Sequence, residues 1–159
     1  MKVLILVHSL TGNTLKFAEA IKGQLAQKGN QTSLVQLRTD PPLEGKGKDP
    51  KDFRITNLPE CSGYDIVLLG CPVWGFSPSP VAMKAVKEVK GLSGKRFMPF
   101  ATQSFPIAAL GGKRTLNVLS NEAGKKGARI VQGVTVQRMF HDIDKETKDR
   151  ASKVPSLLG

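Results

Sequence analysis

The chain has 159 residues, which is enough for one domain with an adequate core, and we expect a single domain over residues 1–159. Lys and Arg number 24 against 13 Asp and Glu, so the formal net charge is +11, which informs on partners rather than on fold. The basic residues are spread along the chain, aromatic residues are few, and no run resembles a nucleic-acid-binding motif. The favoured explanation of the basic residues is that they lie on solvated faces of separate elements. Binding of an acidic protein partner is the second explanation, and binding of nucleic acid is the least favoured.

The sequence contains no apolar stretch approaching the ~20 residues that span a membrane. Its apolar start, MKVLILV, is shorter than the core of a signal peptide and leads into a polar turn without a cleavage site, so we expect a cytoplasmic protein. Cys61 and Cys71 have neither C-x-x-C spacing nor a His-rich neighbourhood. This predicts reduced, buried thiols and no metal site.

The first predicted element, Val3–Val7, is an unbroken apolar run typical of a strand buried on both faces. A compact polar turn follows it, and a helical pattern begins at Leu15. Strand, turn and helix N-terminus together bind phosphate in α/β proteins, because free backbone N–H groups converge there. The turn has no Lys, which favours a phosphate monoester over a metal-bound triphosphate; an ordinary turn that caps the helix is the alternative. The candidate phosphate-binding residues are Ser9, Leu10, Thr11, Gly12, Asn13 and Thr14.

Strand and helix patterns alternate along the rest of the chain. The predicted strands are Val3–Val7, Thr32–Leu37, Tyr64–Gly70, Arg96–Thr102 and Arg129–Arg138. The predicted helices are Leu15–Lys28, Val81–Lys90, Lys113–Lys126 and Asp144–Leu158. The segment Arg38–Glu60 shows neither pattern, and we expect it to wrap the sheet rather than to form a lid. Such alternation predicts a parallel sheet with helices on both faces.

Two unusual loops follow neighbouring strands of this predicted sheet. With the strand order 2-1-3-4-5, the loops Ser9–Thr14 and Pro72–Ser77 meet at the point where the order reverses, which is where such sheets bind ligands. The second loop holds Trp74, the only Trp of the chain. An indole at a loop tip is unfavourable unless it covers a flat apolar group; a Trp packed into the core is the alternative.

These loops carry a family resemblance. S-L-T-G-N-T, starting at Ser9, resembles the S/T-x-T-G-x-T loop with which flavodoxins bind the phosphate of FMN. C-P-V-W-G-F-S-P, starting at Cys71, resembles their second flavin-binding loop, and T-Q-S-F-P, starting at Thr102 and followed by Gly111-Gly112, resembles the third. The resemblance covers nearly the whole chain. It implies an α/β, flavodoxin-like three-layer sandwich with a five-stranded parallel sheet in the order 2-1-3-4-5 and helices on both faces.

The resemblance also implies a function. We expect an FMN-binding flavoprotein that carries electrons between redox protein partners through the semiquinone and hydroquinone states of its flavin, with an acidic partner, as a monomer or weak homodimer. An FMN-dependent NAD(P)H:quinone oxidoreductase, or one acting on a similar small acceptor, is the alternative. A redox-inert binding module that kept the fold is a third hypothesis.

Residue roles follow from the same resemblance. An aromatic residue of the second loop, here Trp74, covers one face of the flavin ring. A peptide beside it turns so that its carbonyl accepts a hydrogen bond from the reduced ring, and Gly75 at the matching position tolerates the positive φ that this requires. The third loop reaches the pyrimidine end of the ring. The implied flavin-binding residues outside the first loop are Pro72, Val73, Trp74, Gly75, Phe76, Thr102, Gln103, Ser104 and Phe105.

The chain departs from flavodoxins in its charge, since they are acidic and place carboxylates round the flavin whereas the second loop here offers Phe76 and Ser77. His8 and His141 are candidate proton donors for a reductase. In the alternative interpretation neither has a catalytic role: His8 is a residue at the end of a strand and His141 lies in a surface loop. We predict no catalytic residue, because no Ser/His/Asp or paired-carboxylate constellation is visible.

Overall fold

A parallel sheet in the order β2-β1-β5-β7-β8 forms the middle layer of the protein, and β9 also pairs with β7. The structure is a computed structural model that describes residues 1–45, 47–104, 111–139 and 142–159. The strands are β1 (Lys2–Val7), β2 (Gln31–Gln36), β5 (Ile66–Trp74), β7 (Arg96–Gln103), β8 (Arg129–Ile130) and β9 (Val134–Gln137). The helices are α1 (Asn13–Gln27), α2 (Pro80–Glu88), α3 (Gly112–Lys125) and α4 (Ile143–Leu158). These strands pair in parallel, which confirms the predicted order 2-1-3-4-5.

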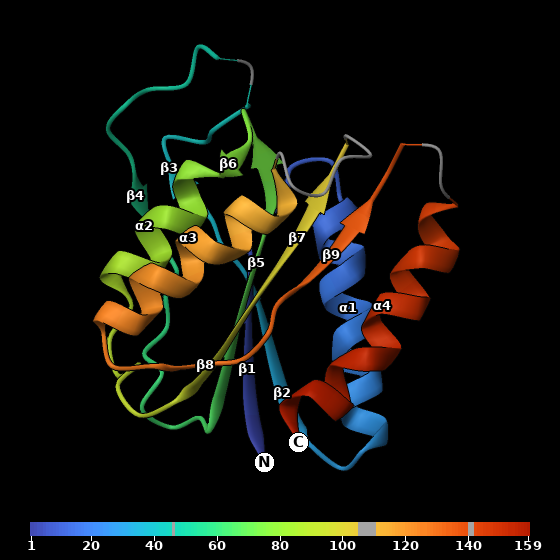
Figure 1. The fold of residues 1–159 in the computed structure, drawn as a ribbon. Coiled ribbons are helices and arrows are strands. Elements are labelled where there is room, and N and C mark those ends of the chain that lie inside the picture. Colours follow the sequence, from blue (N-terminus) through green and yellow to red (C-terminus); the bar gives the residue numbers. More distant parts are fainter. Residues whose placement is uncertain (46, 105–110, 140–141) are drawn as a thin grey trace.

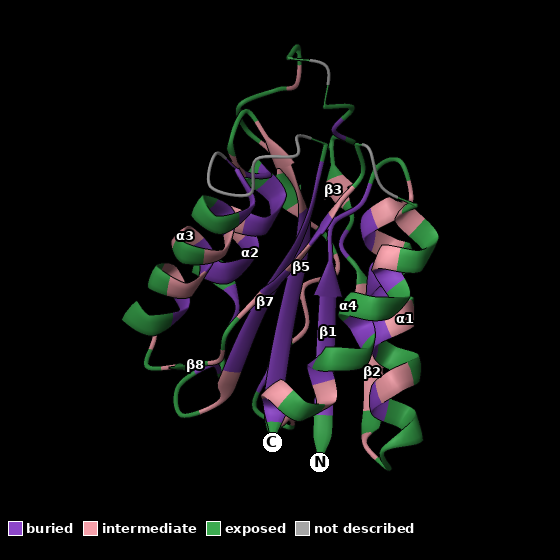
Figure 2. Ribbon diagram, turned by 45° about the vertical axis from the view of Figure 1, so that its right-hand side comes forward, coloured by how far each residue is buried: buried purple, intermediate pink, exposed green. Residues whose placement is uncertain are grey.

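The helices cover both faces of the sheet, α1 and α4 on one side and α2 and α3 on the other (Figure 1). The side chains of β1 alternate between the two layers, as they must along a strand. Val3, Ile5 and Val7 pack in the cluster that includes α1 and α4, whereas Leu4 and Leu6 pack in the cluster that includes α2 and α3. This two-sided burial explains why the first strand is an unbroken apolar run, and Figure 2 shows the central strands buried along most of their length.

The third strand extends further than predicted. It ends at Trp74 rather than at Gly70, because the chain folds back there into the short antiparallel strand β6 (Ser77–Pro78). The predicted loop Pro72–Ser77 is therefore largely a β-hairpin. Because the register of β5 with β7 runs through the pair Pro72 and Thr102, the second and third predicted loops start side by side.

The fifth strand is broken, contrary to the prediction of one strand over Arg129–Arg138. Residues 98–99 of β7 face residues 131–133, so two residues oppose three between the paired positions Phe97–Ile130 and Phe100–Val134. Pro99 has no N–H to donate to the ladder, and a Cβ on Gly133 would lie 2.5 Å from the Pro99 carbonyl oxygen. The break is a bulge at a site where Pro removes a hydrogen bond and Gly allows a close approach.

The segment Arg38–Glu60, predicted to be irregular, contains a small antiparallel pair, β3 (Thr39–Asp40) with β4 (Arg54–Ile55). Its apolar side chains pack against the cluster on the α2 and α3 side; they are Leu43, Phe53, Ile55 and Leu58. Between β3 and β4 the chain arches past the carboxyl ends of the central strands (Figure 1). The segment thus wraps one side of the sheet and also reaches the end where the loops lie.

Candidate functional site

The first loop places the uncapped N-terminus of α1 near the carboxyl end of β1. Gly12 is the N-cap of α1 with φ +92°, and no side chain caps the helix there. Ser9 Oγ accepts a hydrogen bond from the Gly12 N–H at 3.2 Å, and the Asn13 side chain donates to Thr11 Oγ1 at 3.3 Å. The alternative that Thr and Asn merely cap the helix is therefore wrong. The N–H groups of the first turn and the positive end of the helix dipole are free to bind an anion.

Thr14 lies beneath this loop rather than at its mouth. Its hydroxyl is 2.7 Å from the hydroxyl of Thr102, and both residues are buried. This hydrogen bond joins the start of α1 to the end of β7, so it fixes the first loop relative to the third. Thr14 and Thr102 therefore shape the site from below.

The second loop is a tight hairpin turn with an uncommon backbone. Trp74 pairs with Ser77, and the two residues between them, Gly75 and Phe76, have φ +54° and +64°. Positive φ at both central residues defines a type I′ turn, which normally carries Gly, Asn or Asp at these positions. Phe76 is the only described non-glycine residue with positive φ, and such a residue is strained by about 1–3 kcal/mol.

Trp74 packs toward the first loop and the Arg38–Glu60 segment. Its ring lies 5.3 Å from the His8 ring at 76°, an edge-on arrangement. A Cβ on Gly45 would lie 2.9 Å from Trp74 Cζ2 and 3.0 Å from Leu10 Cδ1. The indole remains partly exposed, so stacking of Trp74 on a flavin ring stays a prediction. Gly45 was missed by the sequence analysis, since only the folded chain brings it to the indole.

His8 belongs to the wall of the site. Its Nδ1 lies 2.8 Å from Ser79 Oγ, and Ser79 in turn accepts the Ala82 N–H as the N-cap of α2. Burial lowers the pKa of His8 to about 4, although the charge of Asp49 acts in the opposite direction. His8 is thus a neutral strand-end residue near pH 7, in agreement with the structural alternative. His141, the other candidate donor, lies outside the described residues.

A cavity of about 150 Å³ opens between the second loop, the end of β7 and the start of α3. Its lining residues are Val73, Gly75, Phe76, Gln103, Ser104 and Gly111. Gln103 is 4% exposed, and neither polar atom of its side chain has a partner among the described residues. The predicted second and third loops therefore meet at one cavity; Phe105, also predicted there, lies outside the described residues.

The start of α3 completes this cavity and was not among the predicted site residues. A Cβ on Gly111 would lie 2.8 Å from Val73 Cγ1, and one on Gly112 would lie 2.5 Å from Gln103 Oε1. A side chain at either position would force the neighbouring Val73 or Gln103 side chain to shift, so glycine is what the present packing accommodates. The Gly-Gly pair was visible in the sequence, but its contacts depend on how α3 packs.

Both cysteines are free and buried, as predicted. Burial raises the pKa of the Cys61 thiol to about 11 and that of Cys71 to about 12, so both are protonated at neutral pH. The described part of the chain holds no cluster of three or more His, Cys, Asp or Glu side chains able to bind a metal ion. Within that same part, none of the helices has the length and apolar character needed to cross a bilayer.

The residues present fit FMN. The uncapped N-terminus of α1 suits a phosphate monoester, and the cavity with its unpaired amide suits a ring that has polar atoms on its edge. A doubly covered parallel sheet with an anion cradle after β1 and a cavity between the loops of β5 and β7 defines a flavodoxin-like protein.

The chain matches the family of NADPH-dependent FMN reductases over residues 1–140, and it belongs to that family. It is 26% identical over 121 residues to an NAD(P)H dehydrogenase (quinone) from Archaeoglobus fulgidus, covering 66% of this chain and 63% of the relative. It is 34% identical over 73 residues to a flavodoxin from Nitratidesulfovibrio vulgaris, covering 46% of this chain and 39% of the relative. The chain thus spans less than two thirds of the length of either relative.

A solved structure shows the same fold. Oxidised flavodoxin 2 from Bacillus cereus superposes with a TM-score of 0.69 at 20% identity, covering 99% of this chain and 97% of the other. The flavodoxin-like architecture and FMN as the cofactor are confirmed by the family match together with these likenesses.

Proposed function

We propose that this protein holds FMN between the first loop and the Gln103 cavity and carries electrons between redox protein partners, one at a time. FMN supplies the electron chemistry, since its ring exchanges electrons singly or in pairs. The chain supplies the anion cradle of α1, the cavity beside β7 and the hairpin turn at Gly75 and Phe76. That turn is the observation on which the proposal depends.

A turn of this kind has a second possible arrangement. Rotating the peptide between Gly75 and Phe76 converts a type I′ turn into a type II′ turn, in which the first central residue keeps a positive φ and the second takes a negative φ. Gly75 suits both turns, whereas Phe76 at φ +64° is strained only in the first. The rotation relieves that strain and redirects the Gly75 carbonyl. In flavodoxins a peptide of such a turn rotates when the flavin ring is reduced. This geometry therefore supports one-electron transfer.

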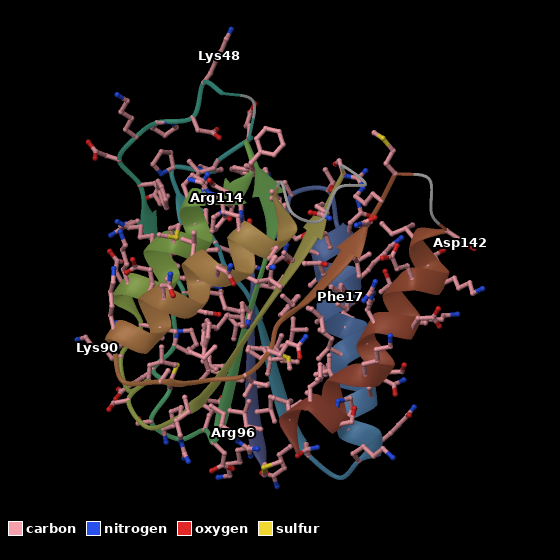
Figure 3. All side chains as sticks on the ribbon, viewed as in Figure 1. Phe17, Lys48, Lys90, Arg96, Arg114 and Asp142 are labelled. Atoms are coloured by element: carbon pink, nitrogen blue, oxygen red, sulfur yellow. The ribbon has the colours of Figure 1, made fainter. Side chains whose placement is uncertain are left out.

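An acidic redox protein is the partner that the charge supports. Two cationic side chains, Lys48 and Arg114, lie toward the carboxyl ends of the strands, and Lys90 and Arg96 lie toward the other end (Figure 3). Lys113 and Arg114 are exposed on the first turn of α3, which carries no acidic residue. Lys113 and Arg114 follow closely after Gly111, which lines the cavity, and would steer an acidic surface toward this end of α3.

The family match favours a second candidate, in which the same site uses NAD(P)H to reduce a quinone or a similar small acceptor. The relative from Archaeoglobus fulgidus carries that name. Hydride transfer from NAD(P)H passes two electrons at once and needs no stabilised one-electron state. The two functions therefore differ in a measurable property of the bound flavin.

A visible spectrum followed through stepwise anaerobic reduction tests the proposal. We expect the FMN-loaded protein to accumulate one-electron-reduced flavin and to oxidise NADPH negligibly. Rapid bleaching by NADPH without that species would support the reductase instead. A protein that purifies colourless and does not bind added FMN would contradict both functions.

A further inference from the structure

Two basic segments that are far apart in the sequence lie side by side at the ends of α2 and α3. Residues 84–95 and 122–129 together hold seven Lys and Arg against two Glu, so they carry +5 of the chain's net charge of +11. The fold joins the two segments, because the Gly94 N–H donates to the Gly127 carbonyl at 2.9 Å. Positive charge that the sequence spreads along the chain is therefore concentrated by the tertiary structure.

Ion pairs within the two segments cancel only part of this charge. Glu88 pairs with Lys84 at 3.1 Å, and Glu122 pairs with Lys125 at 2.9 Å. These two pairs account for both carboxylates of the segments. We call the other five cations the basic face; they are Lys87, Lys90, Lys95, Lys126 and Arg129.

Some cations of the basic face also hold the two segments together. Lys126 Nζ donates to the Lys87 carbonyl at 2.7 Å, near the end of α2, and Arg129 Nη2 donates to the Gly94 carbonyl at 3.1 Å. A carbonyl is neutral, so these bonds fix the two side chains without cancelling their charge. Lys87 and Lys90 are exposed. The face therefore keeps its positive charge after the contacts within the fold are made.

The basic face lies at the opposite end of the sheet from the candidate FMN site. Lys90 lies toward the amino ends of the strands, whereas Lys48 and Arg114 lie toward their carboxyl ends (Figure 3). The nine residues of β5 span about 30 Å at ~3.3 Å per residue. A partner bound at the basic face therefore leaves the cavity at the second and third loops accessible, so this face has a role separate from electron exchange there.

Lysine makes up four of the five cations, which favours a diffuse anionic surface as the partner. An ammonium group is a compact point charge, whereas bidentate recognition of carboxylates is a property of Arg. Arg129 directs both Nε and Nη2 to the Gly94 carbonyl, at 3.3 and 3.1 Å. Residues 87–95 and 125–130 contain no aromatic side chain on which a base could stack. An acidic protein and a nucleic acid therefore match the face less well than a phospholipid surface does.

An exposed aliphatic side chain lies next to the basic face. Ile130 follows Arg129 in the chain and is 45% exposed. Together with Val118 it lines a groove of about 660 Å³ between α3 and β8. Basic side chains beside exposed aliphatic ones are typical of protein surfaces that lie in the headgroup region of a bilayer. The face can thus combine attraction to anionic headgroups with burial of an apolar side chain.

We propose that the basic face binds the surface of a bilayer that contains anionic phospholipids, with Ile130 buried among the headgroups. Each basic side chain close to such a surface strengthens binding, and the attraction falls off within a Debye length. The bound protein presents the opposite end of its sheet, with the candidate FMN site, to redox partners in solution. This inference does not require the proposed electron-carrier function, because it depends on charges remote from the flavin.

Vesicle co-sedimentation of the full chain, with FMN present, tests the proposal. The probes are vesicles of phosphatidylcholine and phosphatidylglycerol in equal parts, and vesicles of phosphatidylcholine alone. We expect the wild type to sediment with the mixed vesicles only, and to be released as salt is raised. Lys87→Gln, Lys90→Gln should weaken binding to the mixed vesicles roughly 10-fold to 30-fold, from the usual contribution of a basic side chain near an anionic surface.

Two further variants separate the face from net charge. Lys22→Gln, Lys28→Gln removes the same charge from exposed positions on α1 and the turn after it, on the other side of the sheet, and should change binding by less than about 2-fold. Ile130→Thr keeps a β-branched residue in β8 but removes aliphatic surface, so it should weaken binding roughly 3-fold.

The outcomes are distinct. Equal binding to both kinds of vesicle, or no binding at low salt, would overturn the proposal. So would equal losses in the two Lys→Gln double variants, because any surface charge would then suffice. Tighter binding of a DNA duplex or of polyglutamate than of the mixed vesicles would assign the face to nucleic acid or to an acidic protein instead. A loss of vesicle binding confined to Lys87→Gln, Lys90→Gln and Ile130→Thr supports the inference.

Discussion

His8 Nδ1 lies 2.8 Å from Ser79 Oγ, and this hydrogen bond joins the carboxyl end of β1 to the N-cap of α2. The same imidazole meets the Trp74 ring edge-on, so one buried side chain connects the first loop, the hairpin turn and α2. The wall of the site is therefore a polar network that depends on a neutral His8.

Acidification should destabilise the protein through His8. Its pKa is about 4 in the folded state and about 6.5 when unfolded, so between these values the unfolded chain binds more protons and stability falls as pH falls. We expect this group to lower the free energy of unfolding by about 2 kcal/mol between pH 7 and pH 5, measured by urea denaturation. His8→Asn keeps a nitrogen near Ser79 but does not titrate, so it should lose this part of the pH dependence. An identical decline in both proteins would contradict the assignment.

Two substitutions in the hairpin turn should change folding stability in opposite directions, and both should reduce the amount of one-electron-reduced FMN. Phe76→Gly should raise the free energy of unfolding by about 1 kcal/mol, because glycine removes the strain at φ +64°. It should also reduce the amount of one-electron-reduced FMN, since that strain favours the rotated peptide. Gly75→Pro excludes positive φ, so it should destabilise the turn and suppress the same species while sparing most FMN affinity. Spectra during stepwise reduction measure both; unchanged yields in the two variants would rule out the rotation.

Trp74→Ala should weaken FMN binding by roughly 1–3 kcal/mol, using the magnitude of base–aromatic stacking. Folding stability should also fall, because the indole packs against His8 and Gly45. Phe53→Ala is the control, as this partly buried ring packs on the core cluster away from the cavity and should lower stability alone. An unchanged dissociation constant in Trp74→Ala would show that the indole is a packing residue only.

Removing the cations on the first turn of α3 should make the reduced flavin harder to form. Each charge ~12 Å away through mostly aqueous surroundings contributes roughly 0.3 kcal/mol, so two correspond to on the order of 20 mV for a one-electron couple. The double variant Lys113→Gln, Arg114→Gln should shift the second one-electron potential downward by that amount. Lys22→Gln, Lys28→Gln removes equal charge from exposed positions on α1 and the turn after it, and should not shift the potential.

The same electrostatic account predicts a salt effect in the wild type. The potential should become more negative as salt is raised, and association with an acidic partner should slow over the same range. A potential that stays flat from low to high salt would refute the account. A partner reaction that accelerates with salt would show that the partner is basic.

Much of the fold was readable from local patterns. Val3–Val7 is apolar at every position because both faces of β1 are covered, and the helix predicted from Leu15 begins two residues earlier, at Asn13 inside the polar turn. Alternating strands and helices then led to the sheet order, and the two unusual loops did follow adjacent strands. Such features are encoded within a few residues, because burial and turn geometry act on neighbouring positions.

The details of the site depend on contacts between distant residues. The break opposite Pro99, the approach of Gly45 to Trp74 and the unpaired amide of Gln103 under Gly112 arise only when separate elements pack. A Gln in a strand is read from its neighbours as an ordinary polar residue. Whether its amide has a partner is set by the position of α3, because hydrogen bonds are satisfied in three dimensions and not along the chain.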